Sequence, residues 1–559
     1  MKRKYWPRIL VLLIAIFAGH SNITAQPVTS GPQVVTFFSN ADDTEQPYGL
    51  YVPKNYDPAR KYPLVMMLHG AGSNHRLALR RVFGKSNGEG ETDVEATRYF
   101  PEWDDVDFIV ASPYVRGTAG YQGIPEQDVY DVLADVKKRF NVDEDRTYLT
   151  GLSMGGGGTL WIGLTRPDIW AAIAPVCPAP PAGTIDLAGN AVNFPVHFFH
   201  GDQDPVVPVQ WTRDWVEKMQ NIGVEVTYKE FVDVKHDSWV SAYDAEYIFG
   251  WFNQVRNKYP NEVRFSSIAY KYNKAYWVEF DGMISGVQAD LTANFKKGNL
   301  IDIKTKNLEG FSVHLKGHAR FNSSQTLNVN IDGTVLSAKT DSTVSFSKAG
   351  DTWKVGKRQS AGITVKHKGL EGPVFDAFSS RHVYVYGTAD NPPADELKMR
   401  LDIANEAANW SAYRGPFLGR VMFFPRVLSD KEVRQSDLDA ANLILFGTKE
   451  TNAVIARFAD KLPVHLNPSA SDYGLLYVFP VNDRYVTVSS GLPWWTGSVD
   501  QGLPFVPVAQ RSLPEFKDIL LFRGSYKSIV TEGYFSQDWK LPATVLTPLI
   551  NAGVVTINK

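Results

Sequence analysis

The stretch that decides the fold of the first half of the chain is Arg146-Thr147-Tyr148-Leu149-Thr150-Gly151-Leu152-Ser153-Met154-Gly155-Gly156-Gly157-Gly158. Residues 146–150 predict a strand, and the glycines from Gly155 onward begin a predicted helix that must pack close to a sheet. Between them, Gly151 to Gly155 match Gly-x-Ser-x-Gly, in which the serine occupies a strained strand-to-helix turn. Both glycines are needed because a β-carbon there would collide with neighbouring backbone. The strand before the motif and the helix after it argue against an ordinary Gly-rich turn.

Apolar runs alternate with helical patterns on both sides of Ser153. The predicted strands are 62–68, 107–111, 146–150, 196–199 and 224–231, and the predicted helices are 126–140 and 209–220. This alternation predicts a mostly parallel sheet covered on both faces by helices. With the serine motif at a strand-to-helix turn, it predicts an α/β-hydrolase fold for residues 28–259.

A serine nucleophile needs a base that takes its proton. In this fold the acid and the histidine follow the serine in chain order. The histidines after Ser153 in this region are His197, His200 and His236. His197 lies inside an apolar predicted strand and His200 ends it, whereas an acid must still fit between serine and base. We therefore predict His236, on the loop after strand 224–231, as the general base.

Two acidic residues compete for the third position, because Asp202 and Asp204 both lie at the carboxyl end of a predicted strand. Catalytic groups gather at that edge of open α/β sheets. Asp204 precedes Pro205-Val206-Val207-Pro208, a stiff turn that can aim its carboxylate, whereas Asp202 beside Gly201 suits a turn cap. We predict Asp204, with Asp202 as the alternative. Its role would be to orient His236 and stabilise the imidazolium.

Two backbone amides are the candidates for an oxyanion hole. The N–H of Met154 follows the nucleophile, and the N–H of Ala71 lies in the small-residue loop after strand 62–68. Each such donor is typically worth about 3 kcal/mol in the transition state. Trp239, three residues after the proposed base, is a candidate wall of the acyl site, and plain packing explains it equally well. No His/Asp/Glu cluster with ligand spacing lies near the serine, so neither a metal nor a cofactor is predicted.

The N-terminus has the pattern of an export signal. Lys2, Arg3, Lys4 and Arg8 surround the start of an apolar run at 9–18, and Ala25 is placed for cleavage. A run of ten apolar residues is half of the ~20 that a membrane-spanning helix needs. We predict a signal peptide at 1–25, no membrane span after its removal, and export to the periplasm or exterior of a bacterium. An uncleaved anchor is the alternative.

The pattern changes twice further along the chain. Residues 261–390 show short strands with a period of two, separated by turn formers, which predicts a β-rich, sandwich-like domain. Asn391-Pro392-Pro393 indicates a linker. Residues 392–559 combine helical patterns with strands, which predicts a smaller α/β domain.

Composition excludes several classes of protein. The 559 residues include 58 Lys and Arg against 60 Asp and Glu, for a formal net charge of −2, and one cysteine, Cys177. Near-neutral charge without a basic block argues against nucleic-acid binding. A single cysteine excludes an intramolecular disulfide framework and a multi-cysteine zinc site. Oligomeric state is not determined by any of these features.

Four motifs together resemble the secreted bacterial carbohydrate esterases of family 1, which include feruloyl and acetylxylan esterases and esterase D. They are 68–72 (LHGAG), 151–156 (GLSMGG), 200–208 (HGDQDPVVP) and 236–239 (HDSW). The resemblance covers about residues 40–258 and implies a serine ester hydrolase with Ser153, Asp204 and His236 as its triad, acting on acylated plant polysaccharide or oligosaccharide.

Two other functions stay open. One is a prolyl-oligopeptidase-like serine peptidase, although only about 40 mature residues precede the oxyanion loop, too few for a propeller at ~40–45 residues per blade. The other is a non-catalytic glycan-binding protein, which the complete set of catalytic residue types disfavours.

Overall fold

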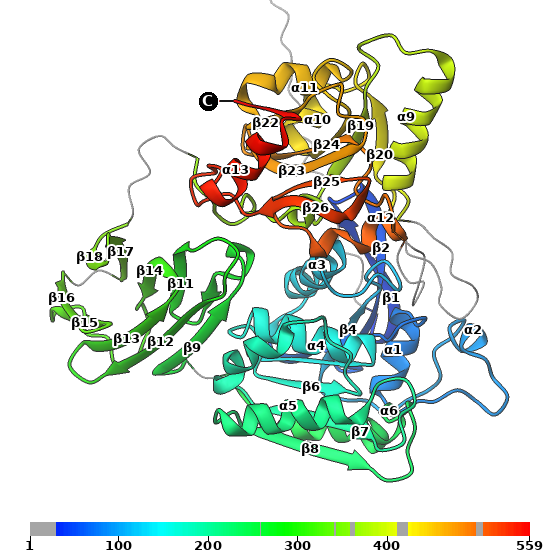
Figure 1. Cartoon of the computed structure of the whole chain (residues 1–559). Coiled ribbons are helices and arrows are strands. Elements are labelled where there is room, and N and C mark those ends of the chain that lie inside the picture. The colour runs from blue at the N-terminus through cyan, green and yellow to red at the C-terminus, as the bar shows by residue number, and fades with distance from the viewer. Residues whose placement is uncertain are drawn as a thin grey trace, which may run out of the picture.

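The computed structural model describes residues 29–257, 259–339, 342–357, 364–410, 423–498 and 507–558. The predicted signal peptide at 1–25 lies outside these residues. Figure 1 shows three bodies: an N-terminal α/β domain (residues 31–252), a β-sandwich to one side (262–355), and a C-terminal α/β domain (374–557) packed against the first. Within the described residues, no helix combines the length and apolarity needed to cross a bilayer.

The N-terminal domain contains an eight-stranded sheet in the order β1-β2-β4-β3-β5-β6-β7-β8. The strands from β4 to β8 run parallel, while β2 is antiparallel to both β1 and β4. This is the strand order of the α/β-hydrolase fold, so the predicted fold is confirmed. The strands are β1 (Gly31–Ser39), β2 (Thr44–Val52), β3 (Tyr62–Leu68), β4 (Ile109–Pro113), β5 (Val142–Leu152), β6 (Ala172–Val176), β7 (Val196–Gly201) and β8 (Val226–Phe231).

Helices cover both faces of this sheet, which explains why its strands are apolar without alternation. In β3, Leu64 and Met66 join one hydrophobic cluster, while Val65 and Met67 join the cluster on the other face. Strands buried on both faces are typical of parallel sheets. The helices are α1 (His75–Val82), α2 (Asp93–Ala96), α3 (Ile124–Arg139), α4 (Met154–Thr165), α5 (Val209–Asn221), α6 (Trp239–Ala242) and α7 (Tyr247–Phe252).

The central body is a sandwich of two five-stranded sheets, β10-β11-β14-β17-β18 and β16-β15-β13-β12-β9. Alternate side chains such as Leu291, Ala293 and Phe295 point into a common core, so the period of two follows from one buried face per sheet. The strands are β9 (Glu262–Ser267), β10 (Lys274–Ala275), β11 (Val278–Met283), β12 (Ala289–Lys296), β13 (Leu300–Lys306), β14 (Leu308–His314), β15 (Leu327–Ile331), β16 (Thr334–Ala338), β17 (Thr343–Ala349) and β18 (Thr352–Val355).

The C-terminal domain is built on a seven-stranded sheet, β20-β19-β21-β24-β23-β25-β26, with a separate β22-β27 pair. The strands are β19 (His382–Tyr386), β20 (Arg426–Ser429), β21 (Asn442–Phe446), β22 (Val464–Leu466), β23 (Tyr473–Val481), β24 (Arg484–Gly491), β25 (Ile519–Arg523), β26 (Ser525–Gly533) and β27 (Val555–Ile557). The helices are α8 (Val374–Ala377), α9 (Ala394–Ala407), α10 (Gln435–Ala440), α11 (Ala453–Phe458), α12 (Val508–Arg511) and α13 (Ala543–Ala552).

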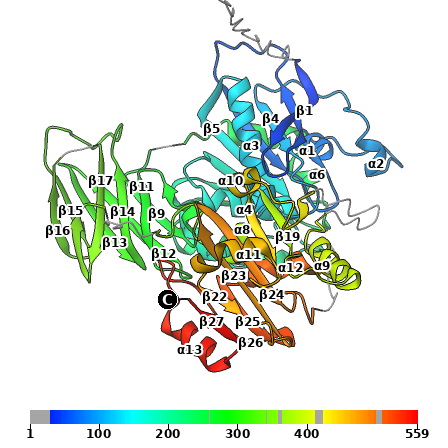
Figure 2. The same ribbon diagram turned by 90° about the horizontal axis from the view of Figure 1, so that it is seen from above.

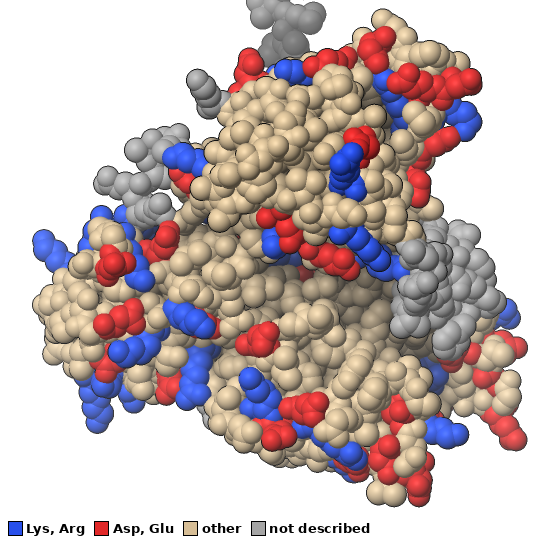
Figure 3. Space-filling model, viewed as in Figure 1, with Lys and Arg blue, Asp and Glu red and all other residues tan. Residues whose placement is uncertain are grey.

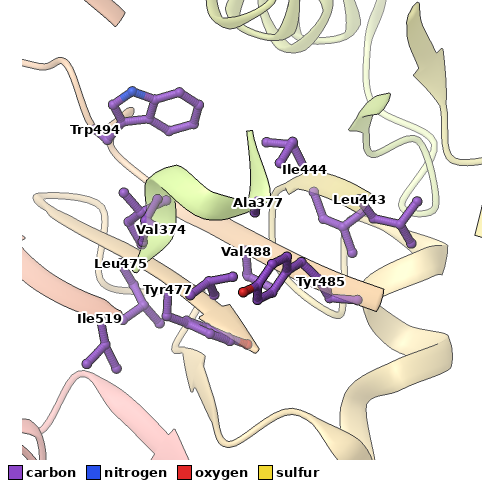
Figure 4. Packing of buried hydrophobic residues seen from close by; sticks show 14 of the residues in the cluster. Val374, Ala377, Leu443, Ile444, Leu475, Tyr477, Tyr485, Val488, Trp494 and Ile519 are labelled. Atoms are coloured by element: carbon purple, nitrogen blue, oxygen red, sulfur yellow. The ribbon is translucent and has the colours of Figure 1, made fainter. Parts of the chain in front are cut away.

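This third sheet begins before residue 392, where the sequence predicts the domain to start. Strand β19 pairs with β20 and β21 and therefore belongs to the C-terminal sheet. The two prolines at 392 and 393 mark the start of α9 instead of a linker, since Pro393 is its N-cap residue. Figure 4 shows α8 packed over the same core, with Val374 and Ala377 facing residues of the sheet.

Polar contacts tie the three bodies together. Glu126 of α3 accepts hydrogen bonds from Lys271 Nζ at 2.9 Å and from Tyr272 OH at 2.7 Å. Glu371, just before α8, accepts from the backbone N–H of Lys271 at 2.6 Å. Figure 2 shows the same arrangement from above, with the sandwich projecting to one side. The segment 270–272 thus contacts both α/β domains.

Candidate active site

Ser153 lies between β5 and α4 in a strained backbone conformation, with φ 55° and ψ −117°. A β-carbon on Gly155 would lie 2.6 Å from the carbonyl oxygen of His69 and closer still to that of Leu68. A β-carbon on Gly151 would lie 2.8 Å from Leu68 Cβ and closer to the Gly155 carbonyl. Positive φ is rare for non-glycine residues and marks functional turns. The two glycines allow β5, α4 and the end of β3 to approach around the serine.

The structure brings Ser153, His236 and Asp204 together. His236 Nε2 lies 3.0 Å from Ser153 Oγ, and His236 Nδ1 lies 2.8 Å from Asp204 Oδ2. The Ser153 hydroxyl and the imidazole are therefore within the distance of a nucleophile–base pair. The Asp204 side chain is fully buried, whereas the His236 side chain keeps 21% of its surface exposed. The imidazole is thus partly accessible to solvent beside a fully buried carboxylate.

Asp204 is held as an anion by four hydrogen-bond donors. Burial raises its pKa, but bonds from His200, His236 and the backbone N–H groups of Val207 and Val206 outweigh burial and hold the pKa below its ordinary value. The Val206 and Val207 bonds measure 2.8 and 2.9 Å. The turn after Asp204 thus aims the carboxylate. Among the described residues, Asp202 makes no hydrogen bond with His236, and its Oδ1 is buried without a partner.

Sequence reasoning considered His200 only as a base and missed its contact with Asp204. His200 Nε2 lies 3.1 Å from both Asp204 Oδ2 and the Val207 carbonyl oxygen, and Nδ1 lies 2.7 Å from Thr212 Oγ1. Both partners of Nε2 are acceptors, so Nε2 carries the proton and Thr212 donates to Nδ1. One carboxylate oxygen therefore accepts from two imidazoles. The only sequence signal was the four-residue spacing within 200–208.

Removing the His200 imidazole is expected to change the pH dependence of catalysis. The bond from His200 helps to hold the Asp204 pKa below its ordinary value, so without this donor that pKa rises and the carboxylate is protonated at a higher pH. We expect His200→Leu to lower kcat/KM about tenfold, equivalent to ~1.4 kcal/mol, and to move the acid limb of the pH–rate profile upward. His200→Gln, which keeps a donor, should restore most of both. A lower melting temperature with an unmoved pH profile would show a merely structural role.

Residues 70–73, which the sequence predicts to form the oxyanion loop, approach the serine from the end of β3. A β-carbon on Gly70 would lie 3.5 Å from Ser153 Cβ. The amides of Gly72 and Ser73 are occupied, by Thr118 Oγ1 at 3.1 Å and the Gly70 carbonyl at 3.2 Å. The Ala71 amide has no hydrogen-bond partner among the described residues. Met154 is the first residue of α4, and such N–H groups have no intrahelical acceptor.

Trp239 lies beside His236, the predicted base. Its ring centroid lies 5.5 Å from that of His236 in an edge-on arrangement, and the half-buried side chain also packs against a core cluster. Both interpretations of this residue, a wall of the site and a packing residue, are therefore compatible with its position. Trp494, by contrast, is fully buried and donates to the Ala509 carbonyl at 2.7 Å, so it is a packing residue.

Cys177 is buried beside the same residues. The Cys177 Sγ, one carboxylate oxygen of Asp204 and one ring nitrogen of His236 all lie within 4.8 Å of one another. Burial raises the pKa of the thiol to about 12, and Sγ–H donates to the His236 carbonyl at 3.6 Å. The thiolate, not the thiol, binds metals. This group therefore suits an acid–base pair next to a packed thiol better than a metal ion.

Comparison with known proteins finds a family model similar to part of the N-terminal region. Residues 39–220 match the family model described as "Putative esterase". We refer to the N-terminal α/β domain, which contains this match, as the esterase domain. The resemblance to carbohydrate esterases that the sequence indicates is thereby confirmed for this domain. The match includes Ser153 and Asp204 and ends before His236.

Individual relatives of the esterase domain are partial matches. A bifunctional acetylxylan esterase/xylanase of Neocallimastix patriciarum is 29% identical over 178 residues, which are 31% of this chain and 23% of that protein. The chain thus spans less than a quarter of the length of this curated relative. A thermostable esterase structure is 27% identical, with a TM-score of 0.33, covering 40% of this chain and 63% of its own. A ferulic acid esterase from Anaeromyces mucronatus, solved with ferulic acid, is 17% identical, with a TM-score of 0.31, covering 40% and 92%.

Proposed function

We propose that this protein is a serine carboxylic-ester hydrolase that acts on feruloyl or acetyl esters of plant polysaccharides or oligosaccharides. The observation that carries the proposal is the continuous chain of contacts from Ser153 Oγ through His236 to the ionised Asp204, at 3.0 and 2.8 Å. The esterase-family match over residues 39–220 supports the same class of reaction.

The geometry supports a two-step acyl transfer. Ser153 Oγ attacks the ester carbonyl carbon while its proton passes to His236 Nε2, and Asp204 stabilises the imidazolium. The Ala71 and Met154 amides would donate to the oxyanion of the tetrahedral intermediate. Collapse expels the sugar alcohol, which takes the proton from His236 and leaves an acyl-serine. Water then gives its proton to His236 and attacks this ester, and the collapse returns the proton to Ser153 as the acid leaves.

The acyl group is proposed from the surroundings of His236. Trp239 beside the imidazole offers a flat apolar surface to an aromatic acid, and the relatives named above include an acetylxylan esterase and a ferulic acid esterase. Assaying the mature chain on an acetyl ester and on methyl ferulate tests this choice. Faster cleavage of ferulate is the expected result, and cleavage of acetyl esters alone would remove the role proposed for Trp239. No cleavage of either ester would overturn the esterase proposal.

The choice of acid has its own test. We expect Asp204→Asn to lower kcat about 10⁴-fold, because the Val206 and Val207 amides keep the side-chain oxygen at the Oδ1 position. The NH₂ group then faces His236 Nδ1 and selects the wrong tautomer. Asp202→Asn is the matched control, two residues away on the same turn, and should change kcat less than tenfold. Steady-state kinetics on one ester decide between them, and the reverse order of effects would make Asp202 the acid.

We propose further that the enzyme works outside the cytoplasm. The support is the sequence pattern of residues 1–25, with a basic start, a short apolar run and Ala25 before Gln26. Polymeric polysaccharide is an extracellular substrate, so this location is consistent with the proposed activity. N-terminal sequencing of the exported protein should begin at Gln26.

A further inference from the structure

A cavity of about 190 Å³ lies between the esterase domain and the C-terminal domain. Figure 3 shows that the surface is hollowed along the junction of these two domains. The esterase domain contributes the segment after β4 and the start of α3, and the C-terminal domain contributes α8, α12 and residues near α9. Ala119 of the esterase domain and Phe375 of the C-terminal domain both line the cavity.

Aromatic rings dominate this lining. Phe375, Phe378, Trp410 and Phe423 all come from the C-terminal domain, and Ile124 and Pro125 face them from α3. An apolar cavity of about 150 Å³ is large enough to take up benzene. The present cavity therefore accommodates one substituted ring. A sugar ring is a poor occupant, because most of its hydroxyl groups would lose their hydrogen bonds against this lining.

Gln510 contributes a buried acceptor to the lining. Gln510 is 2% exposed, and its Nε2 donates to the Ala407 carbonyl oxygen, which fixes the orientation of the amide. Its Oε1 is buried and has no hydrogen-bond partner in the described part of the chain. A buried acceptor without a donor is costly. A ligand hydroxyl group would supply that donor.

The positive charge in the esterase wall is already neutralised. Arg116 is buried and pairs with Asp42 at 2.6 Å and with Asp128 at 2.7 Å. Burial lowers the Arg116 pKa, but the two carboxylates outweigh burial and raise it. Two carboxylates balance this guanidinium, so Arg116 does not make the cavity an anion site. Arg511 of the C-terminal domain also borders the cavity, but the aromatic lining and the buried Gln510 oxygen favour a ring with a hydroxyl donor.

We propose that this cavity is a binding site for a phenolic ring, distinct from the site at Ser153. Its esterase wall is continuous with the oxyanion loop, since Tyr121 OH donates to the His69 carbonyl at 2.8 Å and Thr118 Oγ1 accepts from Gly72 N–H. The ring can come from a free phenolic acid or from a second phenolic acyl group on the same polysaccharide. The second source rests on the proposed function, whereas ring binding itself does not.

Calorimetry on the full mature chain tests the site, with phenol, toluene and glucose as probes. Ala119→Phe places a ring into the cavity, and Ala59→Phe, at an exposed position of the same domain, is the matched control. We expect phenol to bind the wild type and the control, at least tenfold more weakly to Ala119→Phe, and glucose not to bind. Circular dichroism shows whether Ala119→Phe is folded. Phe375→Ala, which enlarges the cavity, is a second variant in which the phenol affinity should change.

Comparing phenol with toluene, which lacks the hydroxyl group, measures the contribution of the Gln510 oxygen to binding. Phenol should bind several-fold more tightly than toluene to the wild type and equally tightly to Gln510→Met. Phenol affinity unchanged in both Ala119→Phe and Phe375→Ala, or glucose binding as tightly as phenol, would overturn the proposal. These outcomes are independent of ester hydrolysis, so a failure of the esterase proposal would be seen separately.

The two sources of the ring are separated by kinetics on oligosaccharides with one or two feruloyl groups. If the second ring occupies the cavity, Ala119→Phe raises KM for the diferuloylated substrate alone. If free ferulic acid is the ligand, Ala119→Phe weakens its binding and leaves the ratio of the two KM values unchanged. Either pattern supports a phenolic site.

Discussion

Ser153→Ala is expected to lower kcat/KM for ester hydrolysis by about 10⁴- to 10⁶-fold. Removing the nucleophile of an interdependent triad costs nearly as much as removing all of its members. What remains is the contribution of the oxyanion hole and of substrate binding. The loss should appear equally on acetyl and feruloyl esters, because both would pass through the same acyl-serine.

Two controls separate chemistry from folding in that comparison. Ser86→Ala, at an exposed serine of the same domain, should keep full activity. A small fluorophosphonate should add its mass to the wild type and to Ser86→Ala but not to Ser153→Ala. Labelling or hydrolysis that persists in Ser153→Ala within tenfold of the wild type would place the nucleophile elsewhere.

The sequence predicted the parts of the fold and site that depend on local chemistry. Gly151 and Gly155 flank Ser153 because β5 and α4 leave no room for a β-carbon, and such a constraint is visible in five residues. The apolar run at 62–68 predicted a strand buried on both faces, which β3 is. The chain order serine, acid, histidine then left few candidates for the acid and the base. The structure brings Ser153, Asp204 and His236 within hydrogen-bond distance.

The features that were missed depend on three-dimensional packing. His200 contacts Asp204 only because the turn after β7 folds the chain back on itself. The predicted start of the C-terminal sheet was too late in the chain. Two consecutive prolines are compatible with a linker and with the start of a helix, and only the pairing of β19 with β21 distinguishes the two. The phenolic cavity joins segments near residues 120, 376 and 511, and no local pattern links these.

The second large effect concerns stability. Gly155→Ala is expected to destabilise the esterase domain by about 3 kcal/mol or more, because the new β-carbon would meet the backbone carbonyl oxygens of Leu68 and His69. Backbone atoms at the centre of a sheet cannot move aside as a flexible side chain can. Either β3 or α4 must shift, and both carry parts of the site. The urea midpoint, followed by tryptophan fluorescence, measures the loss.

Gly250→Ala is the matched control, since Gly250 also lies in a helix of this domain and a β-carbon there would meet nothing within 4 Å. Alanine is a better helix former than glycine by up to ~1 kcal/mol, so this variant should be as stable as the wild type or more so. Replacing glycine with alanine should therefore change the free energy of unfolding in opposite directions at Gly155 and Gly250. The difference between the two changes separates the contact with β3 from helix propensity. Equal midpoints for both variants would mean that the helix start can move away from β3, and the strained position of Ser153 would then need another cause.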